Sequence, residues 1–332
     1  MPEQNENCGV KLREQLGGLI GVEPKMPIRD NFALSVIYTP GVAEPCKQIA
    51  RDPELSYTYT WRGNAVAIIG PEPASLPRLE SVAAMVKMLA GIDAVPLVVA
   101  GETNADVIAA VRSFASTFGA VWLLELSPAD AGQAIAELSD LDIPVLRSPR
   151  DGEHCLGDPS VYPGLIRALL DLRIKELDPR VVVEAVAAGD EDELSFRSAP
   201  RVARAAAEKT VELGLARADL TAAAVEARLR DYLETGALAP FQEPEGWLAA
   251  DAPREQALRL HAHLAGAIEM QPKLRPPDPE RLACVFDGAD EAAAAISESP
   301  GIADRVTCKG NMVAVVTNGT PVLGLGNIGA AA

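Results

Sequence analysis

Four short apolar runs alternate with helix-like segments between residues 65 and 146, and this alternation constrains the fold more than any other feature. The runs are Ala65 to Ile69, Val95 to Val99, Val121 to Leu126 and Pro144 to Leu146. Segments with the length and apolar spacing of helices separate them, at residues 76–89, 104–117 and 128–138. Such alternation predicts a parallel sheet with right-handed crossovers. We therefore expect an α/β fold, followed by a mostly helical region.

Composition excludes several classes of function. The chain has 332 residues, enough for two domains, with 48% hydrophobic and 23% charged residues, as in ordinary globular proteins. Its net charge of −17 argues against nucleic acid or an anionic membrane surface as the main partner. No apolar run reaches the roughly 18 residues that a membrane span needs.

The five cysteines and the polar start of the chain indicate a cytoplasmic protein. The cysteines are scattered and form no C-x-x-C pair, which suits reduced thiols better than a disulfide framework. The first residues, Met-Pro-Glu-Gln-Asn-Glu-Asn, contain no signal-peptide core.

A polar motif precedes the α/β region and presents a tyrosine. It reads Tyr38-Thr-Pro-Gly-Val-Ala-Glu-Pro-Cys46 and is followed by Asp52-Pro53 and Gly63-Asn64. We predict a short β-type run from Leu34 to Tyr38, a break at Pro40-Gly41 and a helix from Ala43 to Ala50. Tyr38 would then lie at a strand-to-helix turn, where a phenol can face a cleft. The alternative is a half-buried tyrosine that only packs at the turn.

These motifs resemble the substrate domain of the malic enzymes, in their compact bacterial form. Two later phrases match as well, at residues 90–96 (Ala-Gly-Ile-Asp-Ala-Val-Pro) and 142–145 (Asp-Ile-Pro-Val). The resemblance implies the family reaction, oxidative decarboxylation of malate to pyruvate, with NAD(P) and Mg²⁺ or Mn²⁺ as cofactors. It also implies an oligomer such as a dimer.

The resemblance is interrupted after Gly152, where family members carry a nucleotide-binding domain. Here the sequence passes to residues 161–173 and 199–217, which resemble segments that follow that domain in the family. We therefore predict a substrate domain at 1–155, a helical region with a linker at 156–250, and a third unit at 251–332. With the nucleotide-binding domain largely missing, we expect no bound cofactor in this chain.

The third unit repeats the start of the chain. Four anchor points recur 247 positions later: Gly41 as Gly288, Pro53 as Pro300, Thr60 as Thr307, and the dipeptide Gly63-Asn64 as Gly310-Asn311. Residues from about Pro272 onward are therefore predicted to be a partial second copy of the substrate-domain start. In this copy Val285 occupies the position of Tyr38. The run Gly324-Leu-Gly326-Asn-Ile-Gly329 matches G-x-G-x-x-G, but only three residues follow it, so we expect a tight turn and not a dinucleotide site.

The resemblance assigns Tyr38 the role of proton donor to the enol carbon, and it places the family's catalytic lysine at Val82. A valine side chain transfers no proton. Lys87 lies five residues further along the predicted helix, about 140° around its axis, and is expected to be a solvated lysine that matches another family lysine.

The metal ligands of the family are also largely replaced. Leu124 occupies the position of the first acidic ligand, so Glu125 is the acid that remains there. Ser148 and Pro149 occupy the later acidic positions. One carboxylate beside two arginines, Arg147 and Arg150, is a poor site for a divalent cation, which prefers several oxygen ligands. Recruitment of Asp151 after a small shift is the alternative.

Three readings of function follow. The first is a catalytically degenerate homologue, a pseudoenzyme with a binding or regulatory role, that binds a small carboxylate such as malate or forms homo-oligomers or hetero-oligomers with an active relative. In that reading Arg147 and Arg150 hold the anion, although both also fit plain surface charge. The second reading is an active malate oxidoreductase, and the third a truncated or rearranged product without function.

Overall fold

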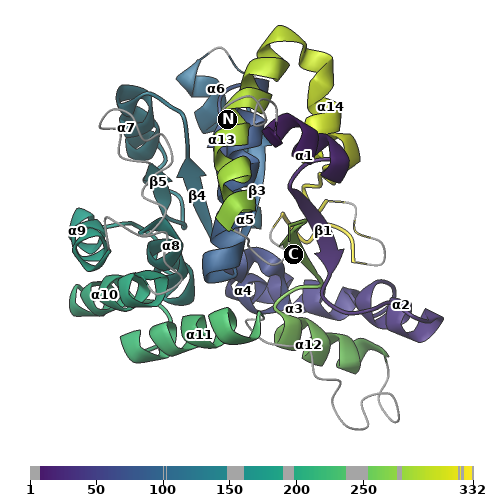
Figure 1. Cartoon of the computed structure of the whole chain (residues 1–332). Coiled ribbons are helices and arrows are strands. Elements are labelled where there is room, and N and C mark those ends of the chain that lie inside the picture. The colour runs from purple at the N-terminus through teal and green to yellow at the C-terminus, as the bar shows by residue number, and fades with distance from the viewer. Residues whose placement is uncertain are drawn as a thin grey trace.

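The centre of the structure is a four-stranded parallel sheet (Figure 1). The computed structural model describes residues 8–99, 101, 103–147, 161–189, 198–236, 253–274, 279–320, 322 and 325–330. The strands are β2 (Ala65–Gly70), β3 (Asp93–Val98), β4 (Ala120–Leu123) and β5 (Val145–Arg147), in the order β3-β2-β4-β5. The predicted α/β class and all four predicted strands are confirmed.

Three helices connect these strands, as predicted: α5 (Leu76–Ala90), α6 (Asn104–Phe114) and α7 (Pro128–Glu137). Local sequence defines their ends. Thr103 and Asp106 form a capping box at the start of α6, and the Ser127 side chain caps α7. Gly91, with φ +66°, ends α5 in a left-handed conformation that favours glycine. We call β2 to β5 with these three helices the α/β body.

The segment before the α/β body is helical where a strand was predicted. It contains α1 (Cys8–Leu16), β1 (Ile20–Pro24), α2 (Asn31–Ile37), α3 (Ala43–Arg51) and α4 (Ser56–Tyr59). The prediction of a β-type run from Leu34 to Tyr38 is wrong. The Asp30 carboxylate accepts a hydrogen bond of 2.7 Å from the Ala33 N–H and starts α2, whose Ala33 and Val36 lie buried on one face.

A mostly helical region follows the sheet, as predicted. It consists of α8 (Tyr162–Asp171), α9 (Pro179–Ala188), α10 (Ser198–Glu212) and α11 (Ala222–Thr235). The predicted boundaries at residues 155 and 250 both fall outside the described residues. Of the predicted linker, Gly236 to Trp247, only Gly236 is described, and it ends α11.

The last part of the chain contains α12 (Pro253–Leu264), β6 (Ile268–Pro272), α13 (Pro279–Glu298) and α14 (Ala303–Val306). Three consecutive short elements recur at the predicted offset of 247 residues. The 3₁₀ helix Pro53–Leu55, α4 and the 3₁₀ helix Trp61–Asn64 return as Pro300–Ile302, α14 and Cys308–Asn311. Strand β6 pairs with β1 in a separate antiparallel ladder. None of the described helices is long and apolar enough to cross a membrane.

Candidate active site

Val82, at the position that the resemblance assigns to the catalytic lysine, is buried. Val82 lies on α5 and is 1% exposed. The hydroxyl of its neighbour Ser81 donates a hydrogen bond of 2.8 Å to the backbone carbonyl of Val285, on α13. Helix α13 therefore covers this part of α5, and it brings the second copy's equivalent of Tyr38 to this place.

Buried charged side chains hold α5 in contact with the segments that cover it. The Glu80 carboxylate accepts hydrogen bonds from the backbone N–H groups of Leu19, at 2.8 Å, and Cys308, at 2.5 Å. The Arg13 guanidinium lies 3.7 Å from the same carboxylate and donates to Ser81 Oγ at 2.7 Å. Burial raises the pKa of Glu80 despite these partners, and it lowers the pKa of Arg13 to about 10. This cluster joins α5 to the segment that contains Arg13 and Leu19 and to the segment that contains Cys308. The Glu80 carboxylate is enclosed by these partners and is not open to a ligand.

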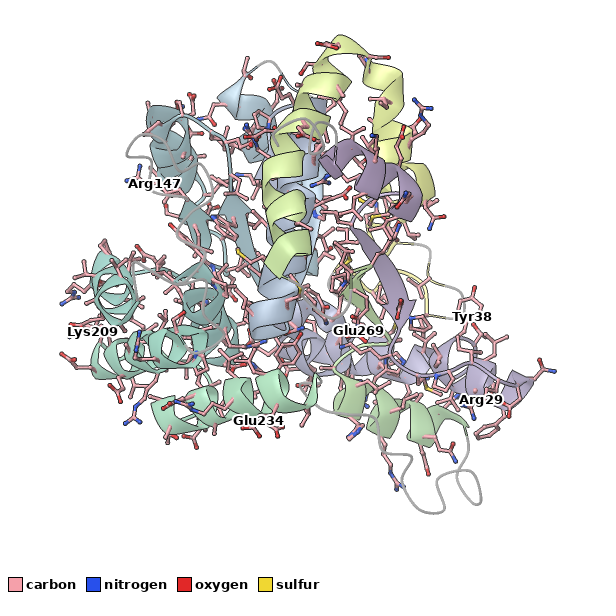
Figure 2. All side chains as sticks on the ribbon, viewed as in Figure 1. Arg29, Tyr38, Arg147, Lys209, Glu234 and Glu269 are labelled. Carbon is pink, nitrogen blue, oxygen red and sulfur yellow. The ribbon has the colours of Figure 1, made fainter. Side chains whose placement is uncertain are left out.

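Tyr38 lies elsewhere. Its side chain is 66% exposed at the end of α2, so it is not the half-buried packing residue of the alternative reading. Figure 2 shows Tyr38 on the opposite side of the molecule from Arg147, which ends β5. Among the described residues, none forms a hydrogen bond with its hydroxyl. The structure does not bring Tyr38 together with Val82 or Glu125.

Glu125 follows β4 at the carboxyl edge of the sheet, where ligands of parallel sheets usually bind. Its φ of +60° lies in the left-handed region, which non-glycine residues rarely occupy and which is enriched at functional sites. The Arg78 guanidinium lies 3.0 Å from its carboxylate and 2.6 Å from that of Asp290, on α13. Although burial lowers the pKa of Arg78, hydrogen bonds to both carboxylates raise it above the usual value. Arg78 thus neutralises Glu125.

Lys87 is buried, which corrects the prediction of a solvated lysine. It is 6% exposed, and its ammonium lies 2.9 Å from a carboxylate oxygen of Asp93 and 2.9 Å from one of Glu269, on β6. Burial alone would lower its pKa, but the two carboxylates raise it. Asn64 also donates to Asp93, at 2.8 Å, and accepts from Arg167. Because Asn64 and Asp93 lie where β2 and β3 begin, this network occupies the amino edge of the sheet, opposite Glu125.

Comparisons with known proteins bear directly on this arrangement. The chain is 32% identical to the NAD-dependent malic enzyme of Geobacillus stearothermophilus over 186 residues. This aligned region covers 52% of this chain and 38% of that enzyme. It is also 32% identical over 165 residues to the bifunctional malic/malolactic enzyme of Bacillus subtilis, covering 46% and 39% of the two chains. This chain is a relative of the malic enzymes.

Solved structures show the same fold. The malic enzyme from Pyrococcus horikoshii superposes with a TM-score of 0.58 at 18% identity, over 72% of this chain and 95% of that one. The Entamoeba histolytica malic enzyme gives a TM-score of 0.62 at 14% identity, over 88% and 93%. No family model matches the sequence. This malic enzyme relative spans less than half the length of the two curated relatives above.

The described residues at the family's metal positions do not fit a divalent cation in this malic enzyme relative. Leu124, at the first acidic position, is 2% exposed, and Glu125 is paired with Arg78. No group of three histidine, cysteine, aspartate or glutamate side chains suitable for a metal occurs among the described residues. Ser148, Pro149, Arg150 and Asp151 lie outside the described part of the chain, so the recruitment of Asp151 and the role of Arg150 stay predictions.

The described part of the glycine-rich run near the end contains a turn. The Gly326 N–H donates a hydrogen bond of 2.9 Å to the Val322 carbonyl, and these two residues form an isolated antiparallel bridge. Gly324 lies outside the described residues. Where the turn is described, it lacks the strand and helix that a dinucleotide site requires on either side.

Proposed function

We propose that this malic enzyme relative is catalytically degenerate and acts as a binding or regulatory protein. The observation that carries this proposal is the environment of Val82. An apolar side chain, 1% exposed and covered by α13, takes the place where the family's reaction needs a proton-accepting amine. The paired state of Glu125 supports the proposal independently, because a neutralised carboxylate attracts a cation weakly. In this proposal the chain binds neither NAD(P) nor Mg²⁺ or Mn²⁺.

The proposed ligand is a small carboxylate such as malate, bound at the carboxyl edge of the sheet. Arg147 ends β5 with its side chain exposed, and its one guanidinium hydrogen bond to a described residue is weak, at 3.4 Å, to the Pro128 carbonyl. A guanidinium presents a fork of N–H donors that matches a carboxylate. The anion would be held by charge at this edge without being oxidised.

Thermal unfolding with added ligand tests this proposal. Malate, oxaloacetate and pyruvate are added in separate series, and at 100 times the dissociation constant a ligand stabilises the folded state by about 2.7 kcal/mol. We expect one of them to raise the melting temperature, and Arg147→Met to remove the shift. Arg180→Met, at an exposed arginine on α9, should keep it. Mn²⁺ should have no effect, whereas a shift with Mn²⁺ would contradict the proposed loss of the metal site.

The same proposal includes assembly with an active relative or with itself. Sedimentation of the purified chain tests self-association directly. A single species with the mass of one chain would exclude the homo-oligomer and leave the partner as a different polypeptide.

A further inference from the structure

Two arginines contact the same tyrosine ring at the amino edge of the parallel sheet. Tyr57 lies on α4 and is 8% exposed. The guanidinium carbon of Arg62 lies 4.3 Å from the centre of its ring, and that of Arg173 lies 5.3 Å from it. Arg62 belongs to the 3₁₀ helix that leads into β2, and Arg173 follows the end of α8. This edge is opposite the one that carries Glu125 and Arg147. We call Tyr57, Arg62 and Arg173 the arginine site.

Hydrogen bonds to the protein hold the Arg62 side chain in place but use only part of it. Its Nε donates to the Phe118 carbonyl at 3.3 Å, and its Nη1 donates to Ser56 Oγ at 2.9 Å. The Thr60 hydroxyl accepts a hydrogen bond of 3.2 Å from the Arg62 backbone N–H. Among the described residues, Nη2 has no acceptor and the guanidinium has no carboxylate partner. The remaining N–H groups of this positioned guanidinium can donate to a ligand.

Arg173 occupies a backbone position that favours glycine. Helix α8 ends with a hydrogen bond of 3.2 Å from the Arg173 N–H to the Leu170 carbonyl and another of 3.2 Å from the Ile174 N–H to the Leu169 carbonyl. In this type of helix end the residue at the position of Arg173 is left-handed, and its φ is +51°. Because the backbone here would prefer glycine, the helix end does not explain an arginine. Non-glycine residues in this region of φ cluster at functional sites.

The charge of Arg173 is not compensated within the described part of the chain. The carboxylates beside it already have other partners: Arg217 lies 3.1 Å from Glu54 and 3.3 Å from Asp142, and Lys175 forms an ion pair with Asp142. Arg217 belongs to the same surroundings, since its backbone N–H donates to the carbonyl of the residue before Arg173, at 2.9 Å. Arg217 and Lys175 thus neutralise these two carboxylates, which leaves both guanidiniums of the arginine site with their positive charge.

The Tyr57 hydroxyl adds a further donor. It forms no hydrogen bond with a described residue, although the side chain is almost completely buried. Burial raises the pKa of this phenol, and the nearby Arg62 lowers it by less. The hydroxyl therefore keeps its proton at neutral pH and can donate it to an anion.

We propose that the arginine site binds a phosphate group, either as inorganic phosphate or as the phosphate of a small monoester. Such a group carries a charge of about −1.5 to −2 at neutral pH and several acceptor oxygens in a small volume. Guanidinium groups bind it through parallel hydrogen bonds, and two guanidiniums that contact one ring can share a single compact anion. A dicarboxylate such as malate has its two charges on separate groups and matches this arrangement less well. The net charge of the whole chain is −17, so local charges hold the anion.

Calorimetric titration of the full chain tests the proposal. Inorganic phosphate and glycerol 3-phosphate are titrated in separate series, at an ionic strength kept constant with sodium chloride. We expect saturable binding with one phosphate group per chain. Binding of both probes would show that the site takes monoesters as well as the free ion, and binding of inorganic phosphate alone would restrict it to the free ion. Absence of saturable binding for both probes would overturn the proposal.

Arg173→Gly separates binding from folding. It should weaken phosphate binding by more than about tenfold, because it removes charge-assisted hydrogen bonds. Its melting temperature without ligand should be no lower than that of the wild type, since glycine adopts the left-handed backbone freely. Arg180→Met removes an exposed arginine that is paired with Asp178 on another surface, and it should bind phosphate normally. Equal affinity of the wild type and Arg173→Gly would overturn the proposal.

A malate titration completes the test. Malate binding that is as tight as phosphate binding, and that is lost in Arg173→Gly, would contradict the assignment to phosphate. The proposed carboxylate site at the opposite edge of the sheet gives a separate result: Arg147→Met should keep phosphate binding, and Arg173→Gly should keep any thermal shift with malate. Failure of one site is therefore distinguishable from failure of the other.

Discussion

Ser81 Oγ lies 2.8 Å from the backbone carbonyl oxygen of Val285, a residue 204 positions later in the chain. This hydrogen bond joins the α/β body to the second copy of the substrate-domain start, beside the position that the resemblance assigns to the lysine. It shows that α13, and not α2, covers this site. Tyr38 and Val82 are therefore equivalent to a catalytic pair by alignment but are not neighbours in this molecule.

Ser81→Ala should destabilise the protein by about 1–3 kcal/mol, because it removes two buried hydrogen bonds, one from Arg13 and one to the Val285 carbonyl. Urea denaturation gives this free energy. Ser113→Ala removes an exposed hydroxyl that bonds only within α6 and should change stability by less than about 0.5 kcal/mol. Equal effects of the two changes would argue against a close contact between α5 and α13.

Lys25 donates to a carbonyl at the end of α12, and Lys273 donates to one at the end of α1. Substitutions of these two lysines should therefore have similar effects on stability. Lys25→Met and Lys273→Met each remove charge-assisted hydrogen bonds to helix-end carbonyls, and each should cost about 1.5–3 kcal/mol in chemical denaturation. Lys309→Met, at an exposed ion pair with Asp304, is the control and should cost less than about 1 kcal/mol. A large effect at one of these lysines and none at the other would contradict their equivalence.

The effects of substituting Lys87 and Asp93, the buried ion pair at the amino edge of the sheet, on stability should be strongly coupled. Lys87→Met leaves the Asp93 carboxylate uncompensated in a place that is 0% exposed, and it should cost about 3–5 kcal/mol. The double change Lys87→Met with Asp93→Asn should cost less than the two single changes combined. A double-mutant cycle in urea measures this coupling, and additive effects would show that the pair does not interact.

Stability should fall in mild acid because of His261. Burial lowers the pKa of this imidazole from its usual value near 6.5, and its Nδ1 lies 3.2 Å from the Tyr59 carbonyl. The unfolded chain therefore binds a proton at a higher pH than the folded protein does. The stabilising contribution is complete above about pH 6.5 and is lost as the pH falls toward the lowered value. Denaturation curves between pH 7.5 and about pH 5 should show this loss, and His261→Gln should reduce it. An unchanged slope in the variant would exclude His261 as the cause.

Local sequence patterns predicted the α/β body, because its strands and helices are defined by apolar spacing and by caps such as Thr103 and Ser127. Helix α2 was not predicted, because its N-cap, Asp30, precedes the run from Leu34 to Tyr38, which was interpreted as extended. The burial of Lys87 was unpredictable from its own helix, since Glu269 reaches it from a strand 182 positions away.

The full extent of the repeat was also missed, although the sequence carries a signal for it. Leu16, Gly18, Ile20, Pro24 and Lys25 recur as Leu264, Gly266, Ile268, Pro272 and Lys273. These pairs are 248 positions apart, one more than the offset that relates the later elements. An ungapped comparison at 247 therefore does not align α12 and β6 with their counterparts, whereas the offset of 248 does, and the pairing of β1 with β6 agrees with it.

The measurement that tests the central claim most directly is the malate-dependent reduction of NAD⁺ and NADP⁺ by the purified full chain in the presence of Mn²⁺. With Val82 in place of the proton-accepting amine and Glu125 bound to Arg78, we predict a rate equal to that of the protein-free blank with either cofactor. Reduction above the blank that disappears in Tyr38→Phe would contradict this prediction and show that a working malate site exists in this chain.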